Sequence, residues 1–179
     1  MYELREPRSG AVLVAATLLC FVSSTVGSRA ETPQSPVGKD EMQQKVTTYF
    51  REAIDGGQAE IIRELFTEQC VIHRPEMDIR GVEPFIKFIG RVPSVYSSFE
   101  TTILDIFSGA DRVTVRVRHV AVSKSQFRSR LGTFDVSGRS VTWDAIAIFR
   151  FEGDKIAEEW VNRDELGMLL SYGILEPAE

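Results

Sequence analysis

The chain has 179 residues, of which 43% are apolar and 26% are charged, and it contains 13 glycines and 7 prolines. This composition is typical of a single globular domain and excludes a disordered chain, a collagen or a repeat array. The net charge of −5 argues against nucleic-acid binding, because contacts with phosphate groups need clustered lysine and arginine.

Residues 1–30 have the features of a secretory signal peptide. The apolar run Ala11–Val22 follows two arginines, and Ser28-Arg29-Ala30 places small residues at the two positions that a signal peptidase recognises. An uncleaved anchor is the alternative, although the run is shorter than the roughly 20 residues that a transmembrane helix needs. We therefore predict an exported protein, secreted or periplasmic, without stable membrane association after cleavage.

Removal of residues 1–30 would leave Cys70 as the one cysteine, which excludes an intramolecular disulfide and a cysteine metal cluster. The two histidines, His73 and His119, are far apart in sequence, so we expect no metal site. The sequence has no glycine-rich phosphate loop and no Gly-x-Ser-x-Gly motif. These observations predict a protein without metal or nucleotide.

Residues 31–39 are polar with two prolines and are typical of a linker, so we expect a folded domain over residues 40–175 and a tail at 176–179. Asp40 and Gln43 have capping-box spacing and open a helix. Its apolar positions, which include Tyr49, recur every three or four residues until a Gly-Gly pair ends the helix.

Two more helices are predicted in the first half of the domain. One spans residues 58–67, and the other begins near Pro84, at a position where a missing N–H costs little. Between them, residues 70–73 form a short strand that Pro75 ends.

The second half of the domain changes to the alternating pattern of strands. Five strands with turns between them form an antiparallel meander: residues 99–107, a strand around 113–117, and residues 128–136, 140–151 and 155–162. A short helix from Asp164 to about Tyr172 closes the domain.

This order predicts an α+β fold in which three N-terminal helices pack on one face of a curved antiparallel sheet, with a short C-terminal helix. A twisted sheet curled over the helices would form a cone-shaped barrel with a deep apolar pocket.

The last strand is a candidate wall of that pocket. Strict alternation puts Ile156, Glu158, Trp160 and Asn162 on one face, and Asp164 follows on that face. Carboxylates beside an indole suggest a polar pocket with an aromatic surface. For Asp164 the alternative is a structural role, because it stands where the N-cap of the closing helix belongs.

Three other residues could carry chemistry. Trp143 lies on the apolar face of the strand before, and Arg150 lies on its other face, where it could bind an anion or a carbonyl oxygen or pair with a neighbouring strand. His119 is in phase with Val113, Val115 and Val117, so it is interior, either as a core histidine or as a general acid or base.

The segment Arg150–Leu175 resembles the end of SnoaL-like polyketide cyclases and ester cyclases: a strand, a glycine turn, Lys-Ile, Glu-x-Trp, an Asp and a Leu-Gly helix. The resemblance extends over residues 40–175 and includes His73-Arg74-Pro75 and Gly81-Val82-Glu83. This group belongs to the nuclear transport factor 2-like superfamily, whose cone of three helices against a curved sheet agrees with the order above.

The resemblance implies that Asp164 is the general acid/base of a cofactor-free aldol ring closure. Where the cyclases carry glutamine and histidine, this chain has Ile148 and Arg150. Arg150 is too basic to exchange a proton at neutral pH but could stabilise an oxyanion. We therefore expect a cyclase or isomerase that binds a hydrophobic carbonyl compound, with Asp164 as base and His119 and Arg150 as helpers.

The expected substrate-binding residues are Tyr49, His73, Trp143, Glu158 and Trp160. The resemblance also makes a homodimer possible. Two alternatives stay open. One is a non-catalytic exported domain that binds a small ligand or dimerises, and the other is a proton shuttle similar to ketosteroid isomerase.

Overall fold

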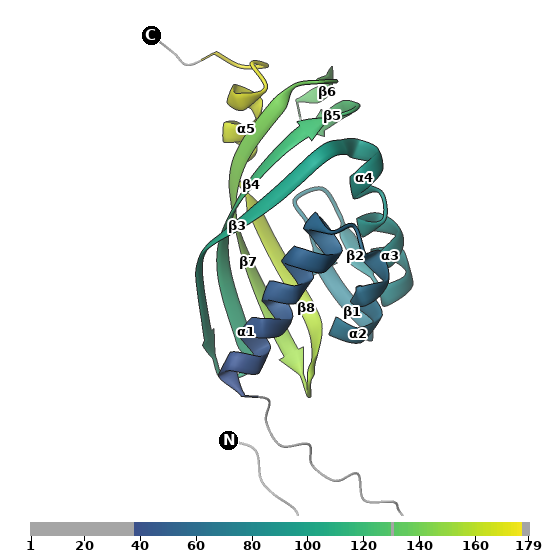
Figure 1. Cartoon of the computed structure of the whole chain (residues 1–179), viewed down its shortest axis with the longest axis vertical. Coiled ribbons are helices and arrows are strands. Elements are labelled where there is room, and N and C mark those ends of the chain that lie inside the picture. The colour runs from purple at the N-terminus through teal and green to yellow at the C-terminus, as the bar shows by residue number, and fades with distance from the viewer. Residues whose placement is uncertain (1–37, 130, 177–179) are drawn as a thin grey trace, which may run out of the picture. The chain divides into compact units, whose positions relative to one another are not determined.

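The structure, a computed structural model, describes residues 38–129 and 131–176 (Figure 1). The expected signal peptide and most of the expected linker lie outside the described residues. In the described part of the chain, no helix is long and apolar enough to cross a membrane.

Helices occupy the first part of the domain. α1 runs from Lys39 to Thr48 and continues into a π-helical segment, η1, over Tyr49–Asp55. The other helical elements are η2 (Ala59–Ile61), α2 (Ile62–Leu65), α3 (Val82–Ile89), α4 (Val92–Val95) and the C-terminal α5 (Glu165–Ser171). In α3, Val82, Phe85, Ile86 and Ile89 are buried, and their spacing forms the single apolar stripe of a helix that packs by one face.

Two sheets follow. The strands are β1 (Phe66–His73), β2 (Asp78–Arg80), β3 (Tyr96–Gly109), β4 (Arg112–Ser123), β5 (Gln126–Ser129), β6 (Gly132–Asp135), β7 (Ser140–Glu152) and β8 (Lys155–Arg163). Six of them form the main sheet in the order β2-β1-β8-β7-β4-β3, and β5 and β6 form a separate hairpin. The helices α1 and α3 lie on one face of the curved main sheet (Figure 1), where α1 contacts β3 and β4 and α3 contacts β1.

The predicted α+β class, with helices on a curved sheet, is confirmed, but the sheet does not close into a barrel. Its edges are β2 and β3, and β1 pairs with β8 in parallel while the other pairs are antiparallel. β1, the first strand along the described chain, thus lies between β2 and the last strand, β8.

Two predicted elements differ from the structure. The helix expected over residues 58–67 ends at Leu65, because Phe66 already pairs with Ile156 of β8. The strand expected over residues 128–136 is the hairpin β5–β6. The turn of this hairpin ends at Gly132, whose φ of 135° is strained for other residues.

The core lies between the helices and the inner face of the sheet. Alternate residues of β4 and β7 are buried there, as the sequence pattern predicts: Val113, Val115, Val117, Val141, Trp143, Ala145, Ala147 and Phe149.

A bulge in β8 changes which side chains face this core. The pairing with β7 runs Phe151–Ile156 and then Arg150–Glu158, so Ala157 is an extra residue in β8. Ile156 and Ala157 are both buried although they are consecutive, and beyond them the alternation is reversed. Strict alternation therefore fails at Ala157, and Glu159 faces the core in place of Glu158.

Candidate functional site

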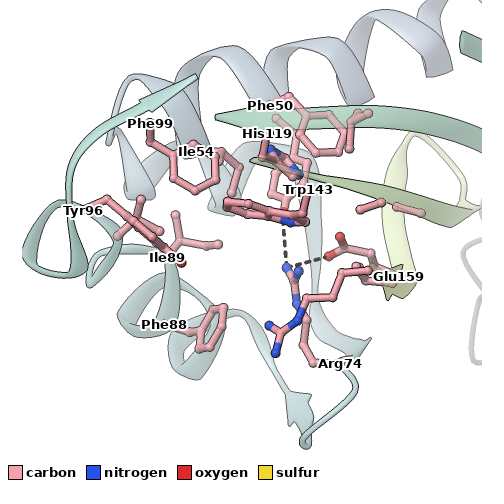
Figure 2. Close-up of a pocket in the computed structure, with 17 residues that line it drawn as sticks. Phe50, Ile54, Arg74, Phe88, Ile89, Tyr96, Phe99, His119, Trp143 and Glu159 are labelled. Atoms are coloured by element: carbon pink, nitrogen blue, oxygen red, sulfur yellow. Dashed lines mark hydrogen bonds and ion pairs between the residues drawn. The ribbon is translucent and has the colours of Figure 1, made fainter. Parts of the chain in front are cut away.

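A cavity of about 150 Å³ lies between η1, α3 and the inner face of the sheet. Aromatic and aliphatic side chains form most of its wall, including Phe50, Phe88, Phe99 and Trp143 (Figure 2). Its polar lining residues are Tyr49, Arg74, Tyr96, His119, Glu159 and Arg163. The cavity thus combines an apolar body with a few convergent polar groups, which is the usual composition of a small-molecule site.

Glu159 is the buried acid of this cavity, with 1% of its surface exposed. Its nearest charge is Arg74, whose Nη2 lies 3.5 Å from Oε2 of Glu159. The same Nη2 donates to the Tyr49 hydroxyl over 3.2 Å. Burial raises the pKa of the Glu159 carboxyl, and Arg74 and Tyr49 offset this only in part.

Arg74 comes from the loop after β1 and points toward Glu159 (Figure 2). Its guanidinium carbon lies 5.5 Å from the centre of the Phe88 ring, a cation–π contact. Burial opposes the charge of Arg74, but Glu159 and Tyr49 outweigh it and raise the pKa of the guanidinium. Arg74 therefore stays charged inside the cavity.

His119 is on β4 and is 8% exposed. Its Nδ1 lies 3.0 Å from Oγ1 of Thr101, and this hydroxyl donates to Oδ1 of Asp55 over 2.7 Å. Because the single hydroxyl proton of Thr101 goes to the carboxylate, the hydroxyl oxygen accepts the Nδ1 proton of His119. The other ring nitrogen, Nε2, carries a lone pair and makes no hydrogen bond to any residue that the structure describes.

The environment of His119 keeps it neutral. Its ring centre lies 4.9 Å from that of Trp143 and 5.2 Å from that of Phe99. Burial, followed by the positive charge of Arg74, lowers the pKa of His119 to about 4. At neutral pH the imidazole is therefore a hydrogen-bond acceptor toward the cavity.

Tyr49, His119 and Trp143 line the cavity, so three of the predicted site residues come together. Asp164 does not. It is exposed and caps α5, where its Oδ1 accepts a hydrogen bond of 2.8 Å from the Gly167 N–H. A Cβ on residue 167 would require this carboxylate to shift.

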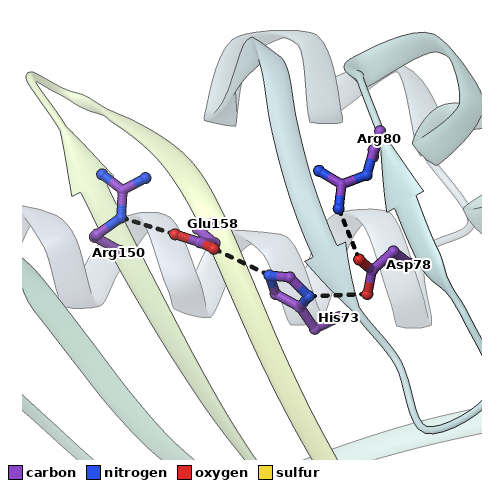
Figure 3. Close-up of polar contacts among 5 residues, drawn as sticks. All are labelled: His73, Asp78, Arg80, Arg150 and Glu158. Atoms are coloured by element: carbon purple, nitrogen blue, oxygen red, sulfur yellow. Dashed lines mark hydrogen bonds and ion pairs between the residues drawn. The ribbon is translucent and has the colours of Figure 1, made fainter.

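The remaining predicted site residues, His73, Arg150, Glu158 and Trp160, lie on the other side of the sheet from the cavity (Figure 3 shows the first three). There Glu158 accepts from His73 Nε2 over 3.0 Å and from Arg150 Nε over 3.0 Å, and Trp160 stacks on His73. The expectation that Glu158 and Trp160 face the pocket is wrong because of the bulge at Ala157.

Sequence reasoning missed Arg74, Glu159 and Arg163. Arg74 belongs to the His73-Arg74-Pro75 motif, which gives no direction for its side chain, and strict alternation puts Glu159 and Arg163 on the outer face. Two consecutive apolar residues, Ile156 and Ala157, are the one signal that could have revealed the change of phase. Among the residues that the structure describes, no group of three His, Cys, Asp or Glu side chains could hold a metal ion.

The family model described as the SnoaL-like domain matches residues 46–159, which is more than half of the chain. The chain belongs to this family. The matched segment contains Tyr49, Arg74, His119 and Glu159 of this SnoaL-like chain and ends before Asp164. Comparison with curated protein sequences gives no match.

Solved structures share the fold. TsrD from Streptomyces laurentii is 22% identical with a TM-score of 0.68, over 78% of this chain and 99% of TsrD. A candidate SnoaL-like polyketide cyclase from Jannaschia sp. CCS1 is 18% identical with a TM-score of 0.67, over 81% of this chain and 99% of its own. An LEH-like epoxide hydrolase from M. tuberculosis is 12% identical with a TM-score of 0.61, over 76% of this chain and 92% of its own. At these identities the likeness shows the fold alone.

Proposed function

We propose that this SnoaL-like chain is a small, cofactor-independent enzyme that removes a proton from the carbon next to a carbonyl group, as in a cyclisation or an isomerisation, with Glu159 as general base. The observation that carries the proposal is a carboxylate that is 1% exposed in a mostly aromatic cavity. A raised pKa makes a carboxylate a stronger base. Apolar cavity walls exclude water, which strengthens the electrostatic interactions of the carboxylate.

The other polar groups supply the remaining parts of such a reaction. The carbonyl oxygen gains negative charge when the α-proton moves to Glu159, and the Arg74 guanidinium, which stays charged, can donate to that oxyanion. Tyr49 keeps its proton, because burial and Glu159 raise the pKa of its hydroxyl. Neutral His119 offers Nε2 as a hydrogen-bond acceptor to the substrate. Protonated Glu159 then returns its proton to the product.

Exchange of α-protons for deuterium tests this proposal without knowledge of the natural substrate. Enolisable ketones of one to three rings, neutral and acidic, are incubated with the protein in D2O, and loss of the α-proton signal is followed by NMR. The wild type should accelerate exchange for at least one compound, and Glu159→Gln should slow it by about 100-fold or more.

The matched control is Glu158→Gln, which changes the neighbouring carboxylate on the other face of β8 and should leave exchange unchanged. If Asp164→Asn abolishes exchange and Glu159→Gln does not, the base is Asp164, as the resemblance implies. If a ketone binds but no exchange occurs, the non-catalytic ligand-binding alternative is favoured.

We also propose that the protein is a homodimer that joins through the outer face of its main sheet. Phe107, Val120 and Ile146 are 56%, 43% and 49% exposed there. Arg116 and Arg118 lie between Val120 and Thr114, the partner of Phe107, so the three apolar side chains do not form one patch, and the proposal rests mainly on the homodimer that the resemblance implies.

A further inference from the structure

The size of the cavity limits what can bind beside Glu159. Its volume is about 150 Å³. An apolar cavity of about this size holds one benzene molecule, whereas sites for larger ligands have about 300–1,000 Å³. One ring with a short substituent fits this volume, and three or four fused rings would extend beyond it.

The polar end of the cavity contains two arginines and one acid. Arg74 and Arg163 contribute two guanidinium groups, Glu159 contributes one carboxylate, and His119 is neutral near pH 7. Burial lowers the pKa of Arg163; the negative charge of Glu165 opposes this effect, and the positive charge of Arg74 adds to it. Glu76 pairs with Arg163, but it does so from outside the cavity lining.

Both arginines also have hydrogen-bond donors to spare. Nε of Arg74 and Nε of Arg163 are buried without an acceptor, and Oε2 of Glu159 is buried without a hydrogen-bond donor. Nη2 of Arg74 contacts Tyr49 and Glu159, and Nη2 of Arg163 contacts Glu76. A carboxylate can accept two parallel bonds from a guanidinium group, which makes it a fitting ligand for such donors.

We propose that the ligand of this cavity is a one-ring oxo acid, with an aromatic or alicyclic ring against Trp143 and Phe50 and a single carboxylate bound by Arg163 and Arg74. The carbonyl part of this substrate class rests on the proposed function. The size and the carboxylate of the ligand rest on the volume of the cavity and on the two unpartnered Nε donors, and not on the proposed function.

Calorimetry with the wild type tests the size and the charge. The probes are phenylglyoxylate, its neutral amide, and anthracene-9-carboxylate, which has three fused rings. Phenylglyoxylate should bind at least about tenfold more tightly than the amide, as a charge-assisted contact in a buried site predicts, and the three-ring acid should not bind. Equal or tighter binding of the amide, or binding of the three-ring acid as tight as that of phenylglyoxylate, would overturn the proposal.

Fluorescence tests the location. The chain has two tryptophans, Trp143 in the cavity and Trp160 on the other face. In Trp160→Phe, the remaining emission comes from Trp143 and should change when phenylglyoxylate binds. In Arg163→Met, the preference for the acid over the amide should disappear, whereas Arg150→Met, on the outer face, should keep it. An unchanged Trp143 emission, or a preference that survives in Arg163→Met, would contradict the proposal.

The two proposals can fail separately. If phenylglyoxylate binds as predicted but no compound exchanges its α-protons, the general-base function fails and the ligand class stands. If Glu159-dependent exchange is seen only with three-ring ketones, the ligand class fails and the function stands.

Discussion

Glu158 and Glu159 are adjacent in sequence, but they lie on opposite faces of the sheet and their pKa values shift in opposite directions. Glu158 lies on the outer face, and its hydrogen bond from His73 lowers the pKa of its carboxyl. Glu159 lies in the cavity, and burial raises the pKa of its carboxyl. Environments that separate the pKa values of two acids also separate their roles. Glu159 is therefore suited to proton transfer, and Glu158 to an ion pair at the surface.

Asp164 has the geometry of a helix cap. Because asparagine caps a helix about as well as aspartate, Asp164→Asn should change the free energy of unfolding by little at any pH. Asp164→Ala should lower it by about 1 kcal/mol, since the Gly167 N–H loses its acceptor. Urea unfolding of the three proteins at several pH values measures this. Clear stabilisation by asparagine near pH 7 would mean that the charge of Asp164 is costly, as expected of a catalytic base.

Single residues were the part of the site least predictable from the sequence. His119 and Trp143 could be placed inside because they alternate in phase with buried neighbours. Glu159 and Arg163 could not, because one extra residue, Ala157, reverses the phase of everything that follows in β8. Arg74 lies in a loop, where no periodicity indicates the direction of a side chain.

At the scale of elements, the π-helical segment η1 and strand β3 are joined by one carboxylate. Asp55, the last residue of η1, accepts from both the N–H and the hydroxyl of Thr101, over 3.1 and 2.7 Å. The Thr101 hydroxyl oxygen in turn accepts a hydrogen bond from Nδ1 of His119. This chain of bonds fixes the helix against the sheet edge and orients the imidazole toward the cavity.

Thr101→Val should break this connection. The variant has nearly the same shape, but it leaves Asp55 and Nδ1 of His119 without the hydroxyl, so the free energy of unfolding should fall by about 1–3 kcal/mol. Thr101→Ser, which keeps the hydroxyl, should recover most of this loss. Thermal or urea unfolding of the three proteins provides the measurement. Equal stability of the valine variant and the wild type would show that the bonds contribute little.

The elements themselves were largely predictable. Alternation placed β7 and β8 within one residue of their observed bounds and located the first half of β4, and the apolar stripe placed α3. The parallel partner of β8 was not predictable, because β1 is far from β8 in sequence and local patterns carry no information on which strands pair. The short strand β2 gives too little pattern to detect, with three residues.

At the scale of the whole molecule, the outer face of the sheet determines the proposed assembly. Ile146 stands near its middle, paired with Arg116 of β4 and Asn162 of β8. Ile146→Glu should turn a dimer into a monomer without loss of thermal stability, because the side chain is half exposed in the single chain. Analytical ultracentrifugation at micromolar concentration distinguishes the two. A monomeric wild type, or a variant that still dimerises, would contradict the homodimer.

The order of helices and strands predicted the layers of the domain correctly, since an amphipathic sheet must bury one face against helices. Closure into a barrel was not predictable, because it depends on strand register and tilt at the sheet edges. Export stays a prediction, because it is based on residues 1–30, which lie outside the described residues.

The central claim, that Glu159 is a buried acid with a raised pKa, is tested most directly by the free energy of unfolding between pH 4 and 8 in wild type and Glu159→Gln. A carboxyl whose folded pKa lies above its unfolded value near 4.3 stabilises the fold less as pH rises through that interval. His119, with a pKa of about 4, contributes the opposite slope in both proteins, so their difference isolates Glu159.

We predict that the wild type loses stability relative to Glu159→Gln as pH rises, and that the exposed control Glu68→Gln follows the wild type. Parallel curves for wild type and Glu159→Gln would contradict the account, because they would show that folding does not change the proton affinity of Glu159.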